Sequence, residues 1–414
     1  MAPITETRPA AGRVERTHSL SNLLDPAVLA NPYPLYARLR AEDPVHWDSF
    51  LHAWVVTRYA EVLTVLQDFS ATRTPTPAQL AGMGLAELSP IAEVMVRQML
   101  FMDPPAHSRL RSLASTVFTP RRVEALRAHV QDIVDRLLDA VQPNGYLDVI
   151  ADLAQPLPTT VTAEMLGVPT ADCGRLKAWS ADFATMLGNF QHNPDHARRV
   201  RQSLTEMCAY FRAAIHEHRD RPRDGVIHAL LTAEHHGDRL AEDEVVANTI
   251  ITMVGGQETT TNLIGNGLLS LLRHPDQLRQ LRADPSLIPA AIEELLRYES
   301  PIQHTARLAP RNLELGGRSI RERQAVIAVI GAANRDPDRF PDPDRLDIRR
   351  QDNRHLAFGW ASHFCFGAPL ARLEAQIVLQ SLLRRMPNLA LEPGPLTWQA
   401  NLTYRGLTAL PVRF

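Results

Sequence analysis

A single cysteine in an aromatic, glycine-rich turn constrains this chain more than any other feature. Residues 358–367 read FGWASHFCFG, and the thiol belongs to Cys365. The next residues, APLARLE, predict a helix start, because Pro369 suits a first turn. The dipole and the unpaired backbone N–H groups of such a start favour a thiolate. A thiolate in an apolar pocket suits a haem iron, and a buried cysteine with a purely structural role is the alternative.

The composition predicts one large globular unit. The chain has 414 residues, 45% of them hydrophobic, and neither a Gly/Ser-rich linker nor an internal repeat divides it. We expect a single domain over residues 19–414, preceded by a flexible segment at 1–18. The net charge of −2 argues against nucleic acid as a partner.

The cysteines and the hydropathy bear on the compartment. Cys173, Cys208 and Cys365 are far apart and show no CxxC spacing, which argues against a disulfide framework and a zinc site. Such cysteine usage fits a reducing cytoplasm. No run approaches the ~20 apolar residues that span a bilayer, and residues 1–19 lack an apolar core. We therefore expect neither a membrane anchor nor a signal peptide.

Most of the chain has the spacing of helices, interrupted by proline and glycine turns. We expect helices at 31–40, 59–66, 242–273 and 290–298, strands at 54–57 and 326–330, and an irregular segment at 70–90. Helices should dominate between residues 91 and 297.

The longest predicted helix, 242–273, carries unfavourable residues at its middle. It begins with acidic residues and ends just before Pro275. Residues 255–261, GGQETTT, cost roughly 2–3 kcal/mol relative to alanine. Such a cost indicates that the helix opens locally or that another group lies against its backbone. A packing notch for a crossing helix is the alternative.

Several charged residues are weak signals when taken one at a time. His107 and Arg111 stand four apart in DPPAHSRLR and so share a helix face, which is commonly a solvated face. Glu294 and Arg297 also share a face, and many exposed helices carry such a pair. Arg307 alone would be an ordinary exposed strand residue. Only their order and spacing relative to the cysteine turn set them apart.

Together these motifs resemble the cytochrome P-450 family. FGWASHFCFGAPLARLE is similar to its haem-binding signature, FGxGxHxCxG followed by LARxE, and departs at Ala361, where the pattern has glycine. An alanine there would cost about 1 kcal/mol if the turn needs a positive φ. The resemblance covers nearly the whole chain. It implies a mainly α fold with a small β-rich lobe, in a triangular single domain.

The resemblance also implies a cofactor and its ligands. Haem b would be bound with Cys365 as the iron ligand and Gly367 beside it. Four further residues would hold the haem propionates: His107, Arg111, Arg307 and His363. The Glu294–Arg297 pair would lock the segment 334–350 behind the cysteine turn, completed by either Arg345 or Arg349.

Residues 255–261 are similar to the family's [AG]GxxTT element, which crosses the distal face of the haem. Glu258 and Thr259 would then be the acid–alcohol pair that relays protons to oxygen. Gly255 and Gly256 would leave room for oxygen and substrate. The predicted substrate pocket comprises Ile251, Val254, Gly255, Ile302, Gln303, Leu402 and Thr403. Segments 70–100 and 181–193 would cover it.

The implied activity is that of a haem-thiolate monooxygenase. It would use O2 to hydroxylate or epoxidise a medium-sized, largely apolar molecule, as in natural-product tailoring. Electrons would come from a ferredoxin and its reductase, and the protein would be a cytoplasmic monomer. The predicted docking surface comprises Arg109, Arg121, Arg122 and Arg372. The alternatives are a peroxide-driven haem-thiolate oxidase, which would not need Glu258 and Thr259, and a non-catalytic haem sensor or carrier.

Overall fold

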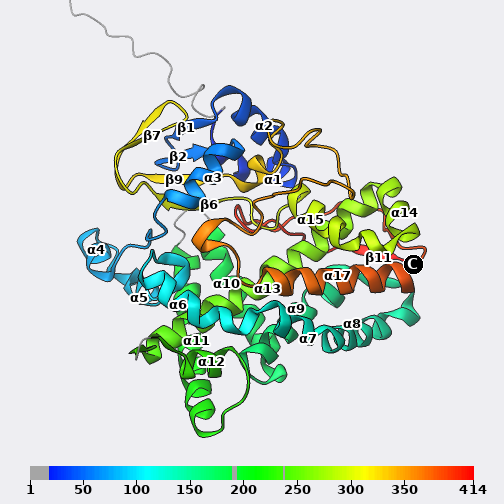
Figure 1. The fold of residues 1–414 in the computed structure, drawn as a ribbon, viewed down its shortest axis with the longest axis horizontal. Coiled ribbons are helices and arrows are strands. Elements are labelled where there is room, and N and C mark those ends of the chain that lie inside the picture. The colour runs from blue at the N-terminus through cyan, green and yellow to red at the C-terminus, as the bar shows by residue number, and fades with distance from the viewer. Residues whose placement is uncertain (1–17, 189–193, 236–237) are drawn as a thin grey trace, which may run out of the picture.

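The computed structural model describes residues 18–188, 194–235 and 238–414, and it is mainly helical with small sheets (Figure 1). The predicted fold class is thereby confirmed. Apart from His18, the predicted flexible segment 1–18 lies outside the described residues. So does the end of the second predicted covering segment, 189–193.

Helices make up most of the described chain, and Figure 1 shows them massed below and to the right of the strands. The α-helices are α1 (Pro26–Ala30), α2 (Tyr33–Glu42), α3 (Tyr59–Asp68), α4 (Pro77–Gly82), α5 (Ser89–Met95), α6 (Ala106–Ala114), α7 (Pro120–Ala125), α8 (Arg127–Val141), α9 (Pro156–Leu166), α10 (Cys173–Gly188), α11 (Pro194–Asp220), α12 (Val226–Thr232), α13 (Glu242–Arg273), α14 (Pro275–Ala283), α15 (Ile288–Tyr298), α16 (Ile330–Ala333) and α17 (Ala368–Arg385).

The largest sheet joins distant parts of the chain. Its order is β1 (Val45–Asp48), β2 (Ala53–Val56), β9 (Ala325–Ala328) and β6 (Thr305–Leu308). Strand β2 pairs in parallel with β9, whereas β1–β2 and β6–β9 are antiparallel. The smaller sheets are β10 (Ala390–Leu391), β11 (Pro411–Arg413) and β3 (Tyr146–Asp148), then β4 (Glu234–His235) with β5 (Asp238–Arg239), and β7 (Leu313–Leu315) with β8 (Arg318–Ile320).

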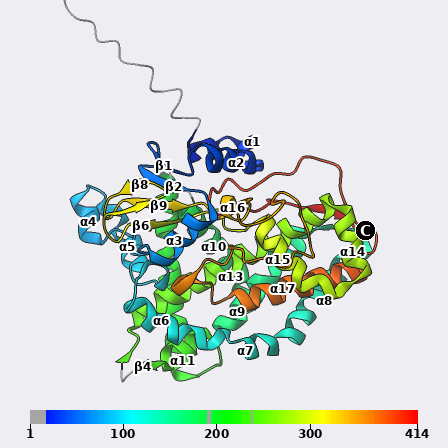
Figure 2. The same ribbon diagram turned by 45° about the horizontal axis from the view of Figure 1, so that its top comes forward.

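Helix α13 is the centre of the helical part. It packs against α9, α10, α11, α15 and α17, and Figures 1 and 2 both show it close to α15 and α17. The Glu244 carboxylate accepts a hydrogen bond from the Ala241 N–H at 2.9 Å, which caps the start. Pro275 begins the next helix, so α13 has the bounds that the sequence predicts. No helix among the described residues is long and apolar enough to cross a membrane.

One segment was predicted wrongly. Residues 70–90 were expected to be irregular, but α4 lies within them and α5 begins at Ser89. A capping box starts α4, because Thr76 Oγ1 accepts from the Gln79 N–H and Gln79 Oε1 accepts from the Thr76 N–H. The predicted helix at 31–40 is α2, which begins two residues later.

Candidate active site

The Cys365 loop is a compact turn closed by backbone hydrogen bonds. The Cys365 N–H donates to the Phe358 carbonyl at 2.8 Å, and helix α17 begins three residues after the cysteine. Gly359 and Ala361 both have positive φ, at 73° and 53°. The turn does need a positive φ at Ala361, and this left-handed backbone costs alanine about 1–2 kcal/mol.

The protonation of the thiol differs from the sequence-based expectation. Burial raises the pKa of Cys365, and this effect outweighs the N–H groups of Gly367 and Ala368 and the charge of Arg111, which lower it. The helix start alone therefore does not make the sulfur a thiolate. A metal ion bound to the sulfur would displace the proton outright.

Helix α13 borders empty space on one side. From Val245 to Leu271 every residue is buried except five, which are partly or fully exposed: Ile251, Gly255, Gly256, Glu258 and Thr259. These positions are spaced so that they lie near one another on a helix. Four of the five residues fall within 255–261, the stretch that the sequence marked as unfavourable for a helix, and Ile251 lies one turn earlier.

The two adjacent glycines have different reasons to be there. A Cβ on Gly256 would lie 2.8 Å from Thr162 Oγ1 of α9, so this glycine permits close helix packing. A Cβ on Gly255 would meet no atom within 4 Å. The interpretation as a packing notch is therefore correct for Gly256, whereas Gly255 faces the open space. The helix itself is continuous through this region.

Glu258 and Thr259 both lie on this open face. The Thr259 hydroxyl donates to the Gly255 carbonyl at 2.7 Å. Burial raises the pKa of the Glu258 carboxyl, and the charge of Lys177 opposes that rise. Glu258 consequently keeps its proton to a higher pH than a solvated glutamate does.

Four basic residues predicted from separate motifs lie within reach of one another. The His107 and His363 rings are 4.1 Å apart between centroids, and Arg111 Nη2 donates to the Phe364 carbonyl beside Cys365. Arg307 is 4% exposed, so its reading as an exposed strand residue is wrong. His107 is equally buried, which excludes a solvated face for it.

This basic cluster lacks partners for some of its nitrogens. His107 Nδ1, His363 Nε2 and Arg307 Nε are buried without a hydrogen-bond partner among the described residues. Burial, aided by Arg307 and His107, lowers the pKa of His363 to about 3. Burial also lowers the pKa of Arg307 to about 10, and it stays charged at neutral pH. Buried donors left in this state indicate a missing anionic partner.

Glu294 and Arg297 form a buried pair that holds the segment 334–350. Arg297 Nε and Nη2 donate to the two Glu294 oxygens at 2.7 and 2.8 Å. Arg297 also donates to the carbonyls of Asn334 and Pro343. The predicted lock is therefore formed.

The third arginine of this network is neither of the two proposed. Arg350 Nε lies 3.2 Å from Glu294 Oε2. Arg345 instead pairs with Asp347, and Arg349 donates to Gln280. The extended segment puts Arg350 toward the buried carboxylate, an orientation that its sequence spacing did not indicate.

The predicted substrate-pocket residues do not all come together. Ile251 and Gly255 lie on the open face of α13, whereas Val254 is wholly buried in the core. Ile302 pairs with Tyr404 in an isolated bridge, and the Thr403 hydroxyl lies 3.2 Å from His304 Nδ1.

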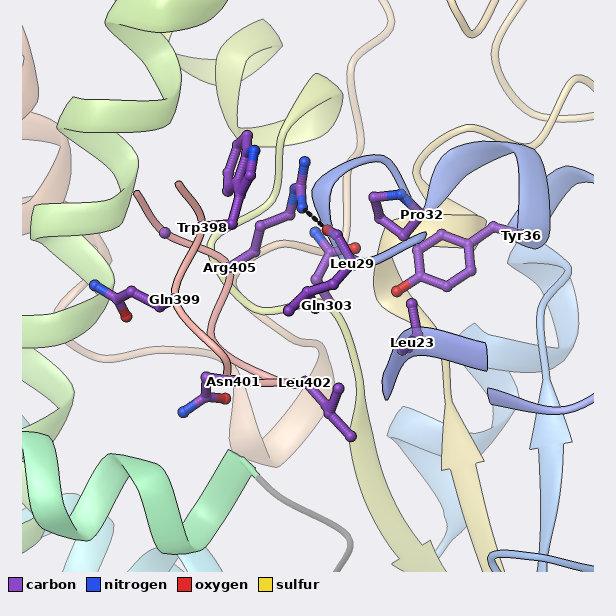
Figure 3. Close-up of a pocket in the computed structure, with 11 residues that line it drawn as sticks. Leu23, Leu29, Pro32, Tyr36, Gln303, Trp398, Gln399, Asn401, Leu402 and Arg405 are labelled. Carbon is purple, nitrogen blue, oxygen red and sulfur yellow. Dashed lines mark hydrogen bonds between the residues drawn. The ribbon is translucent and has the colours of Figure 1, made fainter. Parts of the chain in front are cut away.

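Gln303 and Leu402 belong to a different site (Figure 3). They line a small cavity of about 10 Å³ together with residues of the N-terminal helices, and Leu402 packs in the same core as Leu23 and Tyr36. Arg405 joins this C-terminal loop to the N-terminal helices, because it donates to the Leu29 carbonyl at 2.7 Å (Figure 3). We leave both residues out of the proposed pocket.

The predicted docking arginines fall into two groups. Arg109 pairs with Glu244 at 2.9 Å, and Arg372 pairs with Glu293 at 2.6 Å. These two are therefore engaged within the protein. Arg121 and Arg122 are exposed on α7.

Two residues near the site were missed by the sequence reasoning. Arg73 stands over the Phe101 ring, and its charge helps to lower the pKa of His363. The charge of Arg307 in turn helps to lower the pKa of Arg73. Tyr404 is buried, and its pKa is raised by burial and then by Glu258. No local sequence motif marks either residue.

Comparison with known proteins agrees with this arrangement. A family model for cytochrome P450 matches residues 91–387. Cytochrome P450 monooxygenase PikC of Streptomyces venezuelae is 43% identical over 398 residues, which cover 93% of this chain and 91% of that protein. The 6-deoxyerythronolide B hydroxylase of Saccharopolyspora erythraea is 38% identical, with coverages of 92% and 95%. The structure of P450BioI with hexadec-9Z-enoic acid ligated acyl carrier protein gives a TM-score of 0.88 at 39% identity, covering 94% of this chain and 100% of that chain.

The fold and the site define a helix-rich protein that holds one half-buried thiol beside a cluster of basic residues. With relatives above 30% identity along most of its length, the chain belongs to the cytochrome P450 family. It is a monooxygenase of that family, and membership implies a haem-thiolate cofactor.

The residues present fit such a group. A haem carries two carboxylates and one metal ion, and the site offers orphaned basic nitrogens and one half-buried thiol. A Cβ on Gly255 would meet no atom within 4 Å, so this position would leave room for a bound group. These three features are independent of the family assignment.

Proposed function

We propose that this protein uses haem b to hydroxylate or epoxidise a medium-sized, largely apolar organic substrate. The observation that carries the proposal is the attachment of the Cys365 loop to the basic cluster. Arg111 binds the Phe364 carbonyl, and the His107 and His363 rings are in contact. One thiol, the charged Arg307 with an unpartnered Nε and two histidines with unpartnered ring nitrogens are thus held close together.

Each side chain of this site has a defined task in this proposal. When bound, haem b activates O2 and supplies one oxygen atom to a substrate carbon while the other leaves as water. Cys365 holds the iron through its sulfur, and the N–H groups of Gly367 and Ala368 stabilise the thiolate. The haem carboxylates are bound by His107, Arg111, Arg307 and His363.

The open face of α13 handles protons. Forming water from the second oxygen atom consumes two protons and two electrons. Thr259 holds its hydroxyl at the edge of the open space by its bond to the Gly255 carbonyl. Glu258, whose pKa is raised by burial, passes protons toward that hydroxyl.

The partners are inferred from the surface and from the relatives. We propose that a ferredoxin and its reductase deliver the electrons, with Arg121 and Arg122 of α7 on the docking surface. A relative named as 6-deoxyerythronolide B hydroxylase supports a role in natural-product tailoring. The three cysteines are free thiols, which is consistent with a cytoplasmic monomer.

The iron ligand is tested by the absorption spectrum of the reduced protein under carbon monoxide. The wild type should give the strongly red-shifted Soret band of a thiolate-bound haem. Cys365→Ser should lose that band, because a hydroxyl is a much poorer donor to iron. Cys208→Ser is the matched control and should keep it. Retention of the band in Cys365→Ser would refute the ligand assignment.

The proton relay is tested by Thr259→Ala with ferredoxin, reductase and NADPH supplied. Substrate oxidation should fall at least tenfold per NADPH consumed, and hydrogen peroxide should accumulate instead. Thr252→Ala is the control, because its hydroxyl makes the same bond to the fourth residue before it at 2.7 Å but is buried outside the open face. A wild type that turns over only with added peroxide, and a Thr259→Ala variant unchanged in that reaction, would favour a peroxide-driven enzyme.

A further inference from the structure

Arg73 has a half-buried guanidinium that the mechanism above does not use. Its Cζ lies 4.6 Å from the centroid of the Phe101 ring. It makes long hydrogen bonds from Nη1 to the carbonyls of Ala71 at 3.3 Å and Leu100 at 3.5 Å. Among the described residues no carboxylate forms an ion pair with it. A half-buried cation in this position is stabilised when an anion binds beside it.

The nearby acid, Asp103, is already engaged. Its carboxylate accepts from the Ser70 hydroxyl at 2.5 Å, the Ala71 N–H at 2.7 Å and the Thr72 hydroxyl at 3.1 Å. These bonds shape the segment that carries Arg73 and occupy most of the carboxylate's acceptor sites. Asp103 therefore fixes the position of Arg73 without neutralising it.

The sheet fixes Arg73 next to a second cation. Ser70 and Leu308 exchange two backbone hydrogen bonds of 2.9 Å, which holds the Arg73 segment against strand β6. Arg307 precedes Leu308 in that strand. Burial and then Arg307 lower the pKa of the Arg73 guanidinium to about 9, so it remains charged at neutral pH. The guanidinium groups of Arg73 and Arg307 are thus kept close together, where they could bind an anion that the protein itself does not provide.

Arg73 also lines a cavity of about 340 Å³ that opens to solvent. The other walls combine apolar and polar side chains, among them Met83, Leu308, Gln79 and Arg323. Tyr404, outside this lining, lies within electrostatic reach of both Arg73 and Glu258. Arg73 is therefore in the neighbourhood of the proposed proton relay.

We propose that Arg73 binds the carboxylate of the substrate, so that the substrate is an organic acid with a largely apolar body. This inference rests on the proposed function and narrows its substrate class. The same chemistry would suit a haem carboxylate. We assign Arg73 to the substrate for two reasons. The four basic residues already named supply donors for both haem carboxylates, and Arg73, unlike Arg111 and Arg307, lines the open cavity.

The test measures binding rather than turnover. Haem-loaded protein is titrated by equilibrium dialysis at pH 7.5 with dodecanoic acid and, separately, with methyl dodecanoate. The variants are Arg73→Met, Arg73→Lys and the control Arg311→Met, which removes a charge from the exposed surface outside this cavity. The haem content and the rate of haem transfer to apomyoglobin are measured for each.

The wild type should bind the acid at least tenfold more tightly than the ester, since a hydrogen bond to a charged group is worth about 1.5–3 kcal/mol. Arg73→Met should abolish this preference, Arg73→Lys should keep part of it, and Arg311→Met should keep it all. Equal affinities in the wild type, or an undiminished preference in Arg73→Met, would overturn the proposal.

Faster haem loss from Arg73→Met with an unchanged acid preference would assign Arg73 to a haem carboxylate and would also overturn it. If the proposed function itself is wrong, the result is different. The wild type would then lack the red-shifted Soret band under carbon monoxide, whatever its affinities for the acid and the ester are. The two outcomes are therefore separable.

Discussion

Replacing Ala361 with glycine should stabilise the protein. Ala361 has φ +53°, a conformation that costs an L residue about 1–2 kcal/mol and costs glycine almost nothing. Glycine also has more conformational freedom in the unfolded chain, which lowers the stability of the folded protein by about 0.4–1 kcal/mol. The difference leaves Ala361→Gly about 1 kcal/mol more stable.

Gly359→Ala is the reverse change two residues away, and it should have the opposite sign. Gly359 has φ +73°, and a Cβ there would lie 3.3 Å from the His363 carbonyl oxygen. The left-handed backbone and this tight contact together predict a loss of about 2 kcal/mol. The pair tests the same loop with the same two residue types exchanged.

The assay is differential scanning calorimetry of both variants and the wild type at equal haem content. An unfolding entropy of about 2 cal/mol/K per residue over 414 residues makes 1 kcal/mol equivalent to about 1 °C. We expect Ala361→Gly to raise the midpoint by about 1 °C and Gly359→Ala to lower it by about 2 °C. A lower midpoint for Ala361→Gly, or shifts of the same sign, would show that left-handed strain does not govern this loop.

Two further outcomes follow from buried charges. Arg350→Met should lower the midpoint by about 2 °C, because it removes a hydrogen bond to the fully buried Glu294, while Arg349→Met should change it little; equal effects would contradict the assigned network. Burial raises the pKa of Glu374 to about 8 from about 4.5, so unfolding releases its proton and stability falls as the pH rises between these values. Glu374→Gln should therefore have a higher unfolding midpoint than the wild type at pH 8 but not at pH 5. Parallel curves of midpoint against pH for the two proteins would refute this.

Local sequence signals predicted some elements closely. Acidic residues at the start and Pro275 at the end delimit α13, because they act through the ends of the helix itself. The positive φ of Ala361 was likewise readable, since the resemblance places glycine there. The capping box at Thr76 and Gln79 was equally local, and it could have revealed α4.

Other features depend on contacts between distant segments. Arg73 is oriented by the Ser70–Leu308 pairing, and Leu402 lies in the loop that Arg405 joins to the Leu29 carbonyl. The choice of Arg350 depends on how an irregular segment turns toward Glu294, because arginines recur throughout that segment. No periodicity in the sequence encodes these orientations.

The parallel pairing of β2 with β9 also sets the order in which the chain can be completed during synthesis. Trp54 lies opposite Val326, so the first hairpin leaves the ribosome about 270 residues before its neighbouring strand. At about 5–20 residues per second this interval is roughly 15–50 s. During that time the hairpin exposes an unpaired edge beside the outward-facing Trp47 and Phe50. The nascent protein is therefore most prone to aggregation at its N-terminal lobe, where a chaperone would be most useful.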